Sequence, residues 1–262
     1  MRLMQGSALI GHTGFVGSNL ARDRRFGTLA NSKTIGDLIG RRFETIVCAG
    51  VSATKWLANR DPEADRLGIE RLKTVLETLT AEEFILISTI DVYPDPSQPL
   101  NEDATINNVP SHAYGCHRLE LENWVSSRFE KTRIVRLPAL FGPGLKKNVI
   151  FDLLHDNQTN NINPASSFQW YSLMRLADDL DLIRSQNLSL VNLFPEPIAT
   201  ADILDAFFPN SHPGAPVLPA PNYCLTTRYS KLFGGPHNFV CSRISVLGQL
   251  ADFVANERRN KT

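Results

Sequence analysis

The sequence predicts an α/β protein in which parallel strands alternate with helices in a doubly wound sheet. Up to about residue 142, apolar runs of strand length alternate with segments of helical periodicity, as in strands joined by crossover helices. The run at residues 84–89 is apolar almost throughout, as expected of a strand covered on both faces. A glycine-rich turn follows the first apolar run, and the alternation loosens beyond residue 142. We therefore expect one α/β domain and a smaller second lobe.

The composition is that of a globular protein with a sizeable core. The chain has 262 residues, of which 42% are hydrophobic and 21% are charged. Lysine plus arginine equals aspartate plus glutamate at 27 each, so the net charge is zero. Without a basic excess we expect neither nucleic acid nor an anionic membrane as a partner. No apolar run approaches the roughly 18 residues that a membrane span needs.

The four cysteines are scattered along the chain and form no Cys-x-x-Cys pair. They are Cys48, Cys116, Cys224 and Cys241. This spacing favours free thiols in a reducing compartment over a disulfide framework or a zinc site, so we expect no metal. The first five residues run directly into the first strand and leave no room for a signal peptide. We therefore expect a cytoplasmic protein.

The elements of the first part follow from the apolar runs and the residues that end them. The first strand stops at Gly11, and four further strands are expected at residues 26–30, 44–50, 84–89 and 132–137. Helical patterns lie between them at residues 18–25, 58–79 and 114–129. The longest of these has its apolar positions at Leu67, Leu72, Val75, Leu76 and Leu79.

The second part is less regular. Its helices are expected at residues 173–183, 200–207 and 245–257, and a strand at residues 188–193. Prolines cluster between residues 209 and 221 and predict a loop or hinge. The last helix has an apolar face formed by Val246, Leu247, Leu250, Phe253 and Val254. We assign residues 1–145 to the α/β domain and 146–262 mainly to the smaller lobe, with some segments returning to the first domain.

The glycine-rich turn favours the binding of a phosphate. Gly11, Gly14 and Gly17 follow the first strand and open the first helix. The first glycine allows a sharp turn, the second lets the backbone approach a phosphate, and the third lets the helix lie close to the sheet. The helix N-terminus adds free N–H groups and a positive dipole end. Glycine-rich turns also occur without a ligand, which is the alternative.

The end of the second strand bears on the choice of cofactor. In dinucleotide-binding sheets an acidic residue at this point selects NAD, and a cation accommodates the phosphate of NADP. Asn31, Ser32 and Lys33 stand here, and no carboxylate occurs before Asp37. The segment leans toward NADP, with NAD as the alternative.

A second group of polar residues suggests acid-base chemistry. Ser88 and Thr89 end a buried strand, and Tyr114 begins the next predicted helix. Arg118 lies one helical turn after Tyr114 and therefore shares its face. A phenol with a pKa near 10 is a poor acid-base catalyst at neutral pH, and a nearby cation lowers that pKa. Taken alone, such a pair is also common on a helix surface.

With the glycine turn, these residues resemble the extended short-chain dehydrogenase/reductases of the NAD-dependent epimerase/dehydratase family, which modify nucleotide sugars. Residues 85–93 resemble the family strand that ends in Ser/Thr and is followed by Val-Tyr. Residues 136–144 resemble its Arg-x-x-x-x-Tyr-Gly-Pro-Gly turn, with Phe141 in place of the tyrosine. Residues 168–182 resemble the strand and the Asp-containing helix that follow. The resemblance covers nearly the whole chain, implies a Rossmann-type sheet, and thins after Pro209.

The resemblance implies a role for each matching residue. Thr89 would hydrogen-bond the reacting oxygen, and Tyr114 would be the general acid-base. Arg118 stands where the family has a lysine that binds the nicotinamide ribose, and this exchange is not conservative. The residues expected to contact the cofactor are Gly11, Thr13, Gly14, Phe15, Val16, Gly17, Asn31, Ser32, Lys33, Ala49, Gly50 and Arg118. Those expected to contact the substrate are Thr89, Asp91, Tyr114, Asn148 and Trp170.

The same comparison disfavours 4,6-dehydration. Dehydratases of the family carry Ser-Thr-Asp-Glu-Val-Tyr, and here Ile90 replaces the first acid. Asp91 remains as the one carboxylate of this pair. Its alternative to a catalytic role is to cap the turn after the strand. Trp170 is as readily a core residue as a sugar contact.

The predicted function is that of an NAD(P)-dependent keto-sugar reductase acting on a nucleotide-linked sugar, as in polysaccharide biosynthesis. A small substrate lobe and a single hydride transfer place the reductase ahead of a 4-epimerase, which is the first alternative. The second alternative is a cofactor-binding sensor or assembly protein with weak or no catalysis, because Arg118 departs from the family pattern. The resemblance also implies a homodimer formed through the helices at residues 58–79 and 114–129.

Overall fold

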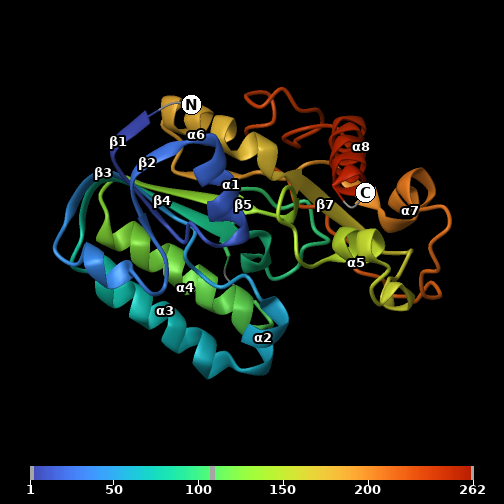
Figure 1. Cartoon of the computed structure of the whole chain (residues 1–262), viewed down its shortest axis with the longest axis horizontal. Coiled ribbons are helices and arrows are strands. Elements are labelled where there is room, and N and C mark those ends of the chain that lie inside the picture. The colour runs from blue at the N-terminus through green and yellow to red at the C-terminus, as the bar shows by residue number, and fades with distance from the viewer. Residues whose placement is uncertain (1–2, 107–109, 261–262) are drawn as a thin grey trace. The chain divides into compact units, whose positions relative to one another are not determined.

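The computed structural model describes residues 3–106 and 110–260, and the chain divides into two compact units (Figure 1). Unit 1 comprises Met1–Asp95, Thr105–Leu137 and Leu176–Val191. Unit 2 comprises Pro96–Ala104, Pro138–Arg175 and Asn192–Thr262. The chain therefore passes from one unit to the other five times, after residues 95, 104, 137, 175 and 191.

A six-stranded sheet forms the centre of unit 1. Its strand order is β2-β1-β3-β4-β5-β8, and the neighbouring strands among β1 to β5 pair in parallel. The strands are β1 (Leu3–Ile10), β2 (Arg25–Ala30), β3 (Arg42–Cys48), β4 (Thr80–Thr89), β5 (Thr132–Leu137) and β8 (Leu190–Asn192). This order confirms the doubly wound sheet and places the topological switch point between β1 and β3, where such sheets bind ligands at the carboxyl ends of their strands.

Helices cover both faces of this sheet. In Figure 1, α3 (Pro62–Leu76) and α4 (Ala113–Arg128) lie along one face, and α1 (Phe15–Asp23) and α6 (Leu176–Ser185) lie on the other. The α3–α4 face buries Ile46, Phe84 and their neighbours in one apolar cluster. Phe84 stacks on Phe129, with 4.3 Å between the ring centroids. Val47 and Ile85, which alternate with these residues along the strands, are also fully buried, as the apolar strand pattern predicted.

The helix predicted at residues 58–79 is wrong as a single element. The structure has α2 (Lys55–Arg60) and α3 instead, separated at Asp61. Pro62 cannot continue a helix because it lacks an N–H group, whereas it fits the first position of a new one. The Asp61 carboxylate caps α3 by accepting a hydrogen bond from the Ala64 N–H at 3.1 Å. Leu67, counted above among the apolar positions, is half exposed.

The start of the first helix also differs from the prediction. It begins at Phe15 rather than at residue 18, directly after Gly14, its N-terminal cap residue. The helix therefore begins within the glycine turn, earlier than its apolar periodicity indicates. Asp37, the first carboxylate after the second strand, lies in a 3-10 helix at Ile35–Leu38.

A buried ion network ties α6 to the sheet within unit 1. The Glu83 carboxylate accepts hydrogen bonds from Arg133 Nε at 2.6 Å and from Arg184 Nε at 2.7 Å. Burial alone would raise the pKa of this carboxyl, but the two guanidinium groups outweigh that effect and hold the pKa below its ordinary value. On the outer edge of α6, Asp178 and Asp181 pair with Arg24.

Unit 2 is built around a three-stranded sheet in the order β6-β7-β9. The strands are β6 (Ala139–Phe141), β7 (Ser167–Ser172) and β9 (Pro197–Ala199), and the helices are α5 (Val149–His155), α7 (Thr200–Phe207) and α8 (Arg243–Arg259). The predicted apolar face of the last helix is confirmed, with Val246 and Leu250 fully buried. The short segment at residues 96–104 is fixed in this unit because the Glu102 carboxylate accepts hydrogen bonds from the Thr227 hydroxyl at 2.6 Å and the Arg228 N–H at 2.9 Å.

Among the described residues, no helix has both the length and the apolarity to span a membrane.

Candidate active site

The glycine turn has the geometry of a cradle that only glycines can form. Gly11 has φ +87°, and a Cβ atom there would lie 2.3 Å from the Ala49 carbonyl oxygen. A Cβ atom on Gly17 would lie 2.1 Å from the Gly11 carbonyl oxygen. Gly14 is exposed, and the nearest atom to its Cβ position is 3.3 Å away. The turn is therefore tight where α1 meets the sheet and open where a ligand can approach.

The first turn of α1 offers backbone donors to an anion. No side chain in the described part of the chain caps this helix, whose first three residues are Phe15, Val16 and Gly17. The N–H groups of a first helical turn have no partner within the helix, and they carry the positive end of its dipole. Thr13 lies exposed in the same turn. The loop that follows β3, with Ala49 and Gly50, lies beside the turn, since the Ala49 N–H donates to the Ile10 carbonyl at 2.9 Å.

The end of β2 carries no acidic side chain next to the glycine turn. The Gly11 N–H donates to the Ala30 carbonyl at 2.7 Å, which brings the residue after β2, Asn31, to the turn. The Asn31 side chain accepts a hydrogen bond from the Lys33 N–H at 2.9 Å. Ser32 and Lys33 are exposed. The segment thus presents amide, hydroxyl and ammonium groups rather than a carboxylate.

Thr89 and Tyr114 meet at the carboxyl end of β4. Thr89 is the last residue of β4, and Tyr114 lies in the first turn of α4, whose N-terminal cap is His112. Burial raises the pKa of the Tyr114 phenol above its ordinary value, and the Arg118 guanidinium lowers it only in part. The phenol therefore keeps its proton at neutral pH.

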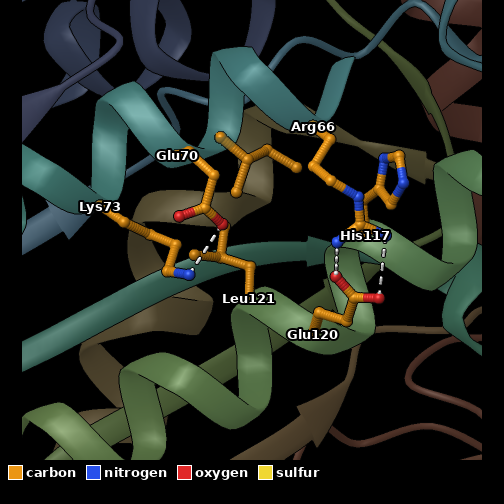
Figure 2. Close-up of a pocket in the computed structure, with 7 residues that line it drawn as sticks. Arg66, Glu70, Lys73, His117, Glu120 and Leu121 are labelled. Carbon is orange, nitrogen blue, oxygen red and sulfur yellow. Dashed lines mark hydrogen bonds and ion pairs between the residues drawn. The ribbon is translucent and has the colours of Figure 1, made fainter. Parts of the chain in front are cut away.

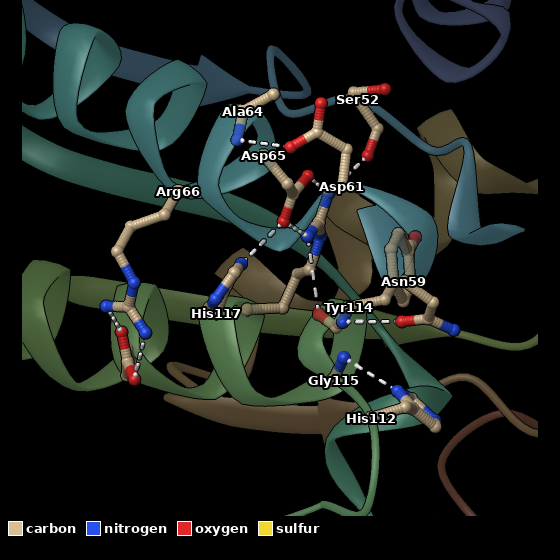
Figure 3. Close-up of polar contacts among 12 residues, drawn as sticks. Ser52, Asn59, Asp61, Ala64, Asp65, Arg66, His112, Tyr114, Gly115 and His117 are labelled. Atoms are coloured by element: carbon tan, nitrogen blue, oxygen red, sulfur yellow. Dashed lines mark hydrogen bonds and ion pairs between the residues drawn. The ribbon is translucent and has the colours of Figure 1, made fainter. Parts of the chain in front are cut away.

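Arg118 is bound to α3. Its guanidinium forms a two-pronged ion pair with the Asp65 carboxylate, in which Nη2 lies 2.8 Å from Oδ1, and it also donates to the Ser52 carbonyl at 2.6 Å. Both side chains are almost completely buried. Figure 3 shows the Asp65 carboxylate joined to His117, with Tyr114 nearby in the first turn of α4. The Arg118 guanidinium carbon lies 3.9 Å from the centroid of that ring.

This geometry differs from what a lysine at position 118 would give. The Arg118 charge is balanced by Asp65, while the guanidinium stays against the ring of Tyr114. His117 shares the carboxylate, with Nδ1 at 2.7 Å. Burial alone would raise the pKa of Asp65, but hydrogen bonds from Arg118 and His117 lower it below its ordinary value. The sequence analysis did not find Asp65, because no motif or spacing connects it with Arg118.

A second ion pair joins α2 to the turn that follows β4. Lys55, the first residue of α2, places its Nζ 2.6 Å from Asp91 Oδ1. The other carboxylate oxygen of Asp91 accepts the Thr89 hydroxyl hydrogen at 3.2 Å. The Asp91 N–H in turn donates to Thr89 Oγ1, so that Thr89 caps the short turn at Ile90–Val92. Lys55, like Asp65, gave no sequence signal.

A buried network of hydrogen bonds and an ion pair connects α4 with the ends of β4 and β5. Glu122 of α4 accepts hydrogen bonds from Arg136 Nη2 at 2.6 Å and from the Ser88 hydroxyl. Arg136 also donates to the Tyr93 hydroxyl at 2.9 Å and lies against its ring. Arg136 of the predicted family turn is therefore a structural residue that fixes α4 relative to β4 and β5.

Asn148 and Trp170 belong to unit 2. Asn148 caps α5, accepting from the Phe151 N–H at 3.1 Å and donating to the Leu140 carbonyl at 2.8 Å. Trp170 lies in β7 and is 2% exposed. Their expected contact with a substrate stays a prediction, and both have a structural role within their own unit.

A small cavity between α3 and α4 lies apart from these groups. Arg66, Glu70, Lys73, Glu120 and His117 are among the residues that line it (Figure 2). Its volume of about 20 Å³ holds roughly one water molecule. Arg66 and Glu120 form an ion pair at 2.6 Å across its rim. It is too small for a nucleotide or a sugar.

Comparison with known proteins decides the family. The model of the NAD dependent epimerase/dehydratase family matches residues 23–165, which is more than half of the chain. The chain belongs to this family. The match includes Thr89, Tyr114 and Arg118, and it begins after the glycine turn. Epimerases and dehydratases are enzymes, so the chain is a member of an enzyme family, and the predicted resemblance is confirmed.

Solved structures share the fold over most of the chain at low identity. A dTDP-4-dehydrorhamnose reductase from Clostridium acetobutylicum is 15% identical with a TM-score of 0.71, covering 95% of this chain and 99% of its own. The UDP-N-acetylglucosamine 4-epimerase from Methanobrevibacter ruminantium is 12% identical with a TM-score of 0.70, covering 86% and 90%. MoeE5, solved with UDP-glucose and NAD, is 16% identical with a TM-score of 0.73, covering 98% and 99%. These similarities confirm the Rossmann-type fold. No curated protein matches the sequence.

Proposed function

We propose that this protein is a nicotinamide-dependent reductase that acts on a ketone of a nucleotide-linked sugar. The observation that carries the proposal is the position of Thr89 at the carboxyl end of β4 and of Tyr114 in the first turn of α4, with the Arg118 guanidinium against the Tyr114 ring. The glycine cradle ends β1 of the same sheet. A buried phenol that keeps its proton at neutral pH is suited to give that proton to a developing alkoxide, which is the requirement of reduction.

The residues of unit 1 fit the pyrophosphate of a dinucleotide. The cradle excludes a Cβ atom at Gly11 and Gly17, and the uncapped N-terminus of α1 supplies donors beside it. The cofactor supplies or accepts the hydride when bound. The loop at Ala49 and Gly50 would border the dinucleotide, and the segment Asn31–Lys33 would meet its adenosine ribose.

The chain's own residues handle the proton. Tyr114 gives its proton to the substrate oxygen, and Thr89 provides a hydrogen-bonding oxygen next to it. Arg118 holds its positive charge against the ring face and partly offsets the cost of a buried phenolate. Asn148 and Trp170 are proposed substrate contacts of unit 2, and residues 146–262 are proposed as the main substrate lobe.

NADP is the proposed cofactor, with NAD as the alternative. The exposed Ser32 and Lys33 offer a hydroxyl and an ammonium to a ribose phosphate. A carboxylate, which would accept hydrogen bonds from a free ribose hydroxyl, is absent at Asn31, Ser32 and Lys33.

Two measurements on the purified protein test this function. In a fluorescence titration of NADPH and NADH we expect binding in the micromolar range, tighter for NADPH. With a panel of keto-sugar nucleotides, Tyr114→Phe should lower kcat by about 10²–10⁴-fold while leaving cofactor affinity within a factor of two. Absence of binding of both nucleotides at tens of micromolar would remove the basis of the proposal. Equal turnover by Tyr114→Phe and the parent would remove the role of Tyr114.

A cofactor-binding protein with little catalysis is the second candidate. It is favoured by one observation, namely that Asp65 neutralises the cation that would activate Tyr114. Replacement of Arg118 by lysine separates the two candidates. A large gain in turnover would indicate a site that has lost its activity, whereas unchanged or reduced turnover would indicate a site adapted to arginine.

A further inference from the structure

The loop between β3 and α2, residues 49–54, is held at two points. At its start, the Ala49 N–H donates to the Ile10 carbonyl at 2.9 Å, and the Ala49 carbonyl oxygen lies 2.3 Å from the position of a Cβ atom on Gly11. Further along, the Ser52 carbonyl accepts a hydrogen bond from Arg118 Nη2 at 2.6 Å. The loop therefore connects the glycine cradle with α4.

The Arg118 guanidinium has no Nη hydrogen left for a ligand. Nη1 donates to Asp65 Oδ2 and to the Tyr114 carbonyl, the latter at 3.3 Å. Nη2 donates to Asp65 Oδ1 at 2.8 Å and to the Ser52 carbonyl, so every Nη hydrogen has a protein acceptor. Nε is buried and has no hydrogen-bond partner among the residues that the structure describes. With an exposed fraction of 4%, the side chain serves the protein interior rather than the solvent.

Asp65 fixes the orientation of this guanidinium from α3. It lies in the first turn of that helix, which begins anew at Pro62. The carboxylate also binds His117 Nδ1 at 2.7 Å, and neither of these two side chains is more than 6% exposed. A two-pronged contact between a guanidinium and a carboxylate sets orientation as well as distance. The guanidinium is therefore held in one orientation, with its carbon 3.9 Å from the centroid of the Tyr114 ring.

We propose that Arg118 and Asp65 are positioning residues that set the loop at residues 49–54 relative to Tyr114. One guanidinium joins the Ser52 carbonyl of this loop to the carbonyl and the ring of Tyr114. Figure 3 shows Ser52, Asp65 and Tyr114 together, each from a different segment of the chain.

The inference rests on the proposed function, in which the loop borders the dinucleotide and Tyr114 gives the proton. A hydride and a proton reach the same carbonyl group only if the cofactor and the phenol keep a fixed separation. A rigid connection between their supports maintains that separation. Arg118 then acts on the cofactor through the loop, without touching it.

A pair that only stabilises the fold would respond differently to substitution. Replacement of a buried ion pair by apolar side chains of similar size commonly preserves stability. Such a replacement cannot restore the hydrogen bond to the Ser52 carbonyl. The double variant Asp65→Leu/Arg118→Met therefore separates stabilisation of the fold from positioning of the loop.

The test measures backbone ¹⁵N order parameters of residues 50–54 in the free protein and NADPH affinity by fluorescence. We expect order parameters near about 0.85 in the parent and below about 0.6 in Arg118→Met and in the double variant. Both variants should bind NADPH about tenfold more weakly, because a charge-assisted hydrogen bond that orders the loop is lost. In the double variant these losses should occur although its thermal unfolding midpoint lies near that of the parent.

Arg66→Met is the matched control. Arg66 forms another two-pronged pair between α3 and α4, with Glu120 at 2.6 and 3.2 Å, but this pair is exposed. Among the described residues it has no hydrogen bond to the loop or to Tyr114. The variant should therefore leave the order parameters and the NADPH affinity unchanged.

Parent-like order parameters in the folded double variant would overturn the inference. Weaker NADPH binding combined with a rigid loop would mean instead that Arg118 touches the cofactor directly. A failure of the proposed function is a different result, since it shows as absence of NADPH binding by the parent. The order parameters are measured without any nucleotide and still report on the loop in that case.

Discussion

At the scale of single residues, the ion pair of Arg118 with Asp65 decides what position 118 can contribute. The guanidinium donates to four oxygens, namely both carboxylate oxygens of Asp65 and the carbonyls of Ser52 and Tyr114. A lysine would reach only one or two of these acceptors because its ammonium lacks the planar fork. The pair therefore locks the α4 side chain in place and leaves Tyr114 in contact with a charge that is already neutralised.

Replacement of Asp65 by asparagine should destabilise the fold strongly. The variant leaves the buried Arg118 without its carboxylate and weakens the contact with His117, so we expect a loss of about 3–5 kcal/mol in the free energy of unfolding at pH 7. Urea denaturation measures this loss. Glu120→Gln is the control, because it removes an exposed partner of Arg66 and should cost less than about 1 kcal/mol.

The Asp65 variant should also change the pH dependence of stability. Because Arg118 and His117 lower the pKa of Asp65 in the folded state, its contribution is present above the unfolded pKa of about 4 and is lost as the pH falls through the lowered value. The difference between the parent and Asp65→Asn should therefore be constant near neutrality and shrink below about pH 4. A difference that persists unchanged in acid would contradict this assignment.

Much of the site was predictable residue by residue, because Thr89 and Tyr114 occur at motif positions that the sequence displays. The structure places Thr89 at the end of β4 and Tyr114 in the first turn of α4, as the predicted strand end and helix start require. Asp65 and Lys55 were not predictable, since they come from α3 and α2 and reach the site only through tertiary packing. No spacing rule connects residues 65 and 118 in a sequence.

At the scale of elements, the contact between β1 and α1 depends on glycine at one position. Gly17→Ala would put a methyl group 2.1 Å from the Gly11 carbonyl oxygen, so α1 must move from the sheet. We expect a loss of about 1–3 kcal/mol in unfolding free energy and at least a tenfold loss in nucleotide affinity. Calorimetry and the fluorescence titration measure the two effects.

Gly68→Ala, in α3, should have the opposite effect on stability. Nothing lies within 4 Å of its Cβ position, and it stands in a helix interior, so alanine should stabilise by about 0.5–1 kcal/mol. Nucleotide affinity should stay unchanged. If Gly17→Ala behaved like Gly68→Ala, the tight cradle would not exist in solution.

Element order was more predictable than element ends. Apolar runs located β3, β4 and β5, because a strand covered on both faces is apolar along most of its length. β2 gave a weaker signal, and its exposed and partly buried residues alternate in the structure. Pro62 divides the predicted long helix because a missing N–H group overrides continuous apolar periodicity.

At the scale of the whole molecule, unit 1 depends on a segment far along the chain. Strand β8 borders β5, and α6 supplies the partners of Arg24 and Glu83. A fragment of residues 1–145 lacks both elements. It should be aggregated or poorly protected in hydrogen exchange. Without β8, the edge of β5 has no neighbouring strand, and without α6 part of the Glu83 network is lost.

Co-expression with residues 146–262 is the control for this fragment and should restore soluble protein if the second piece supplies β8 and α6. A monomeric, well-protected fragment obtained alone would show that residues 1–145 fold independently. Light scattering of the full chain would at the same time test the proposed homodimer through α3 and α4.

The union of Asp65 with Arg118 also constrains how such a chain can change by mutation. Replacement of Arg118 by lysine leaves an acid that matches it poorly, and loss of the acid first leaves a buried arginine without its counter-charge. Each first step is expected to carry a cost that the second step repairs. Descendants of this protein would therefore exchange the two residues together or retain both. A search that changes one position at a time would find no improved variant at either residue.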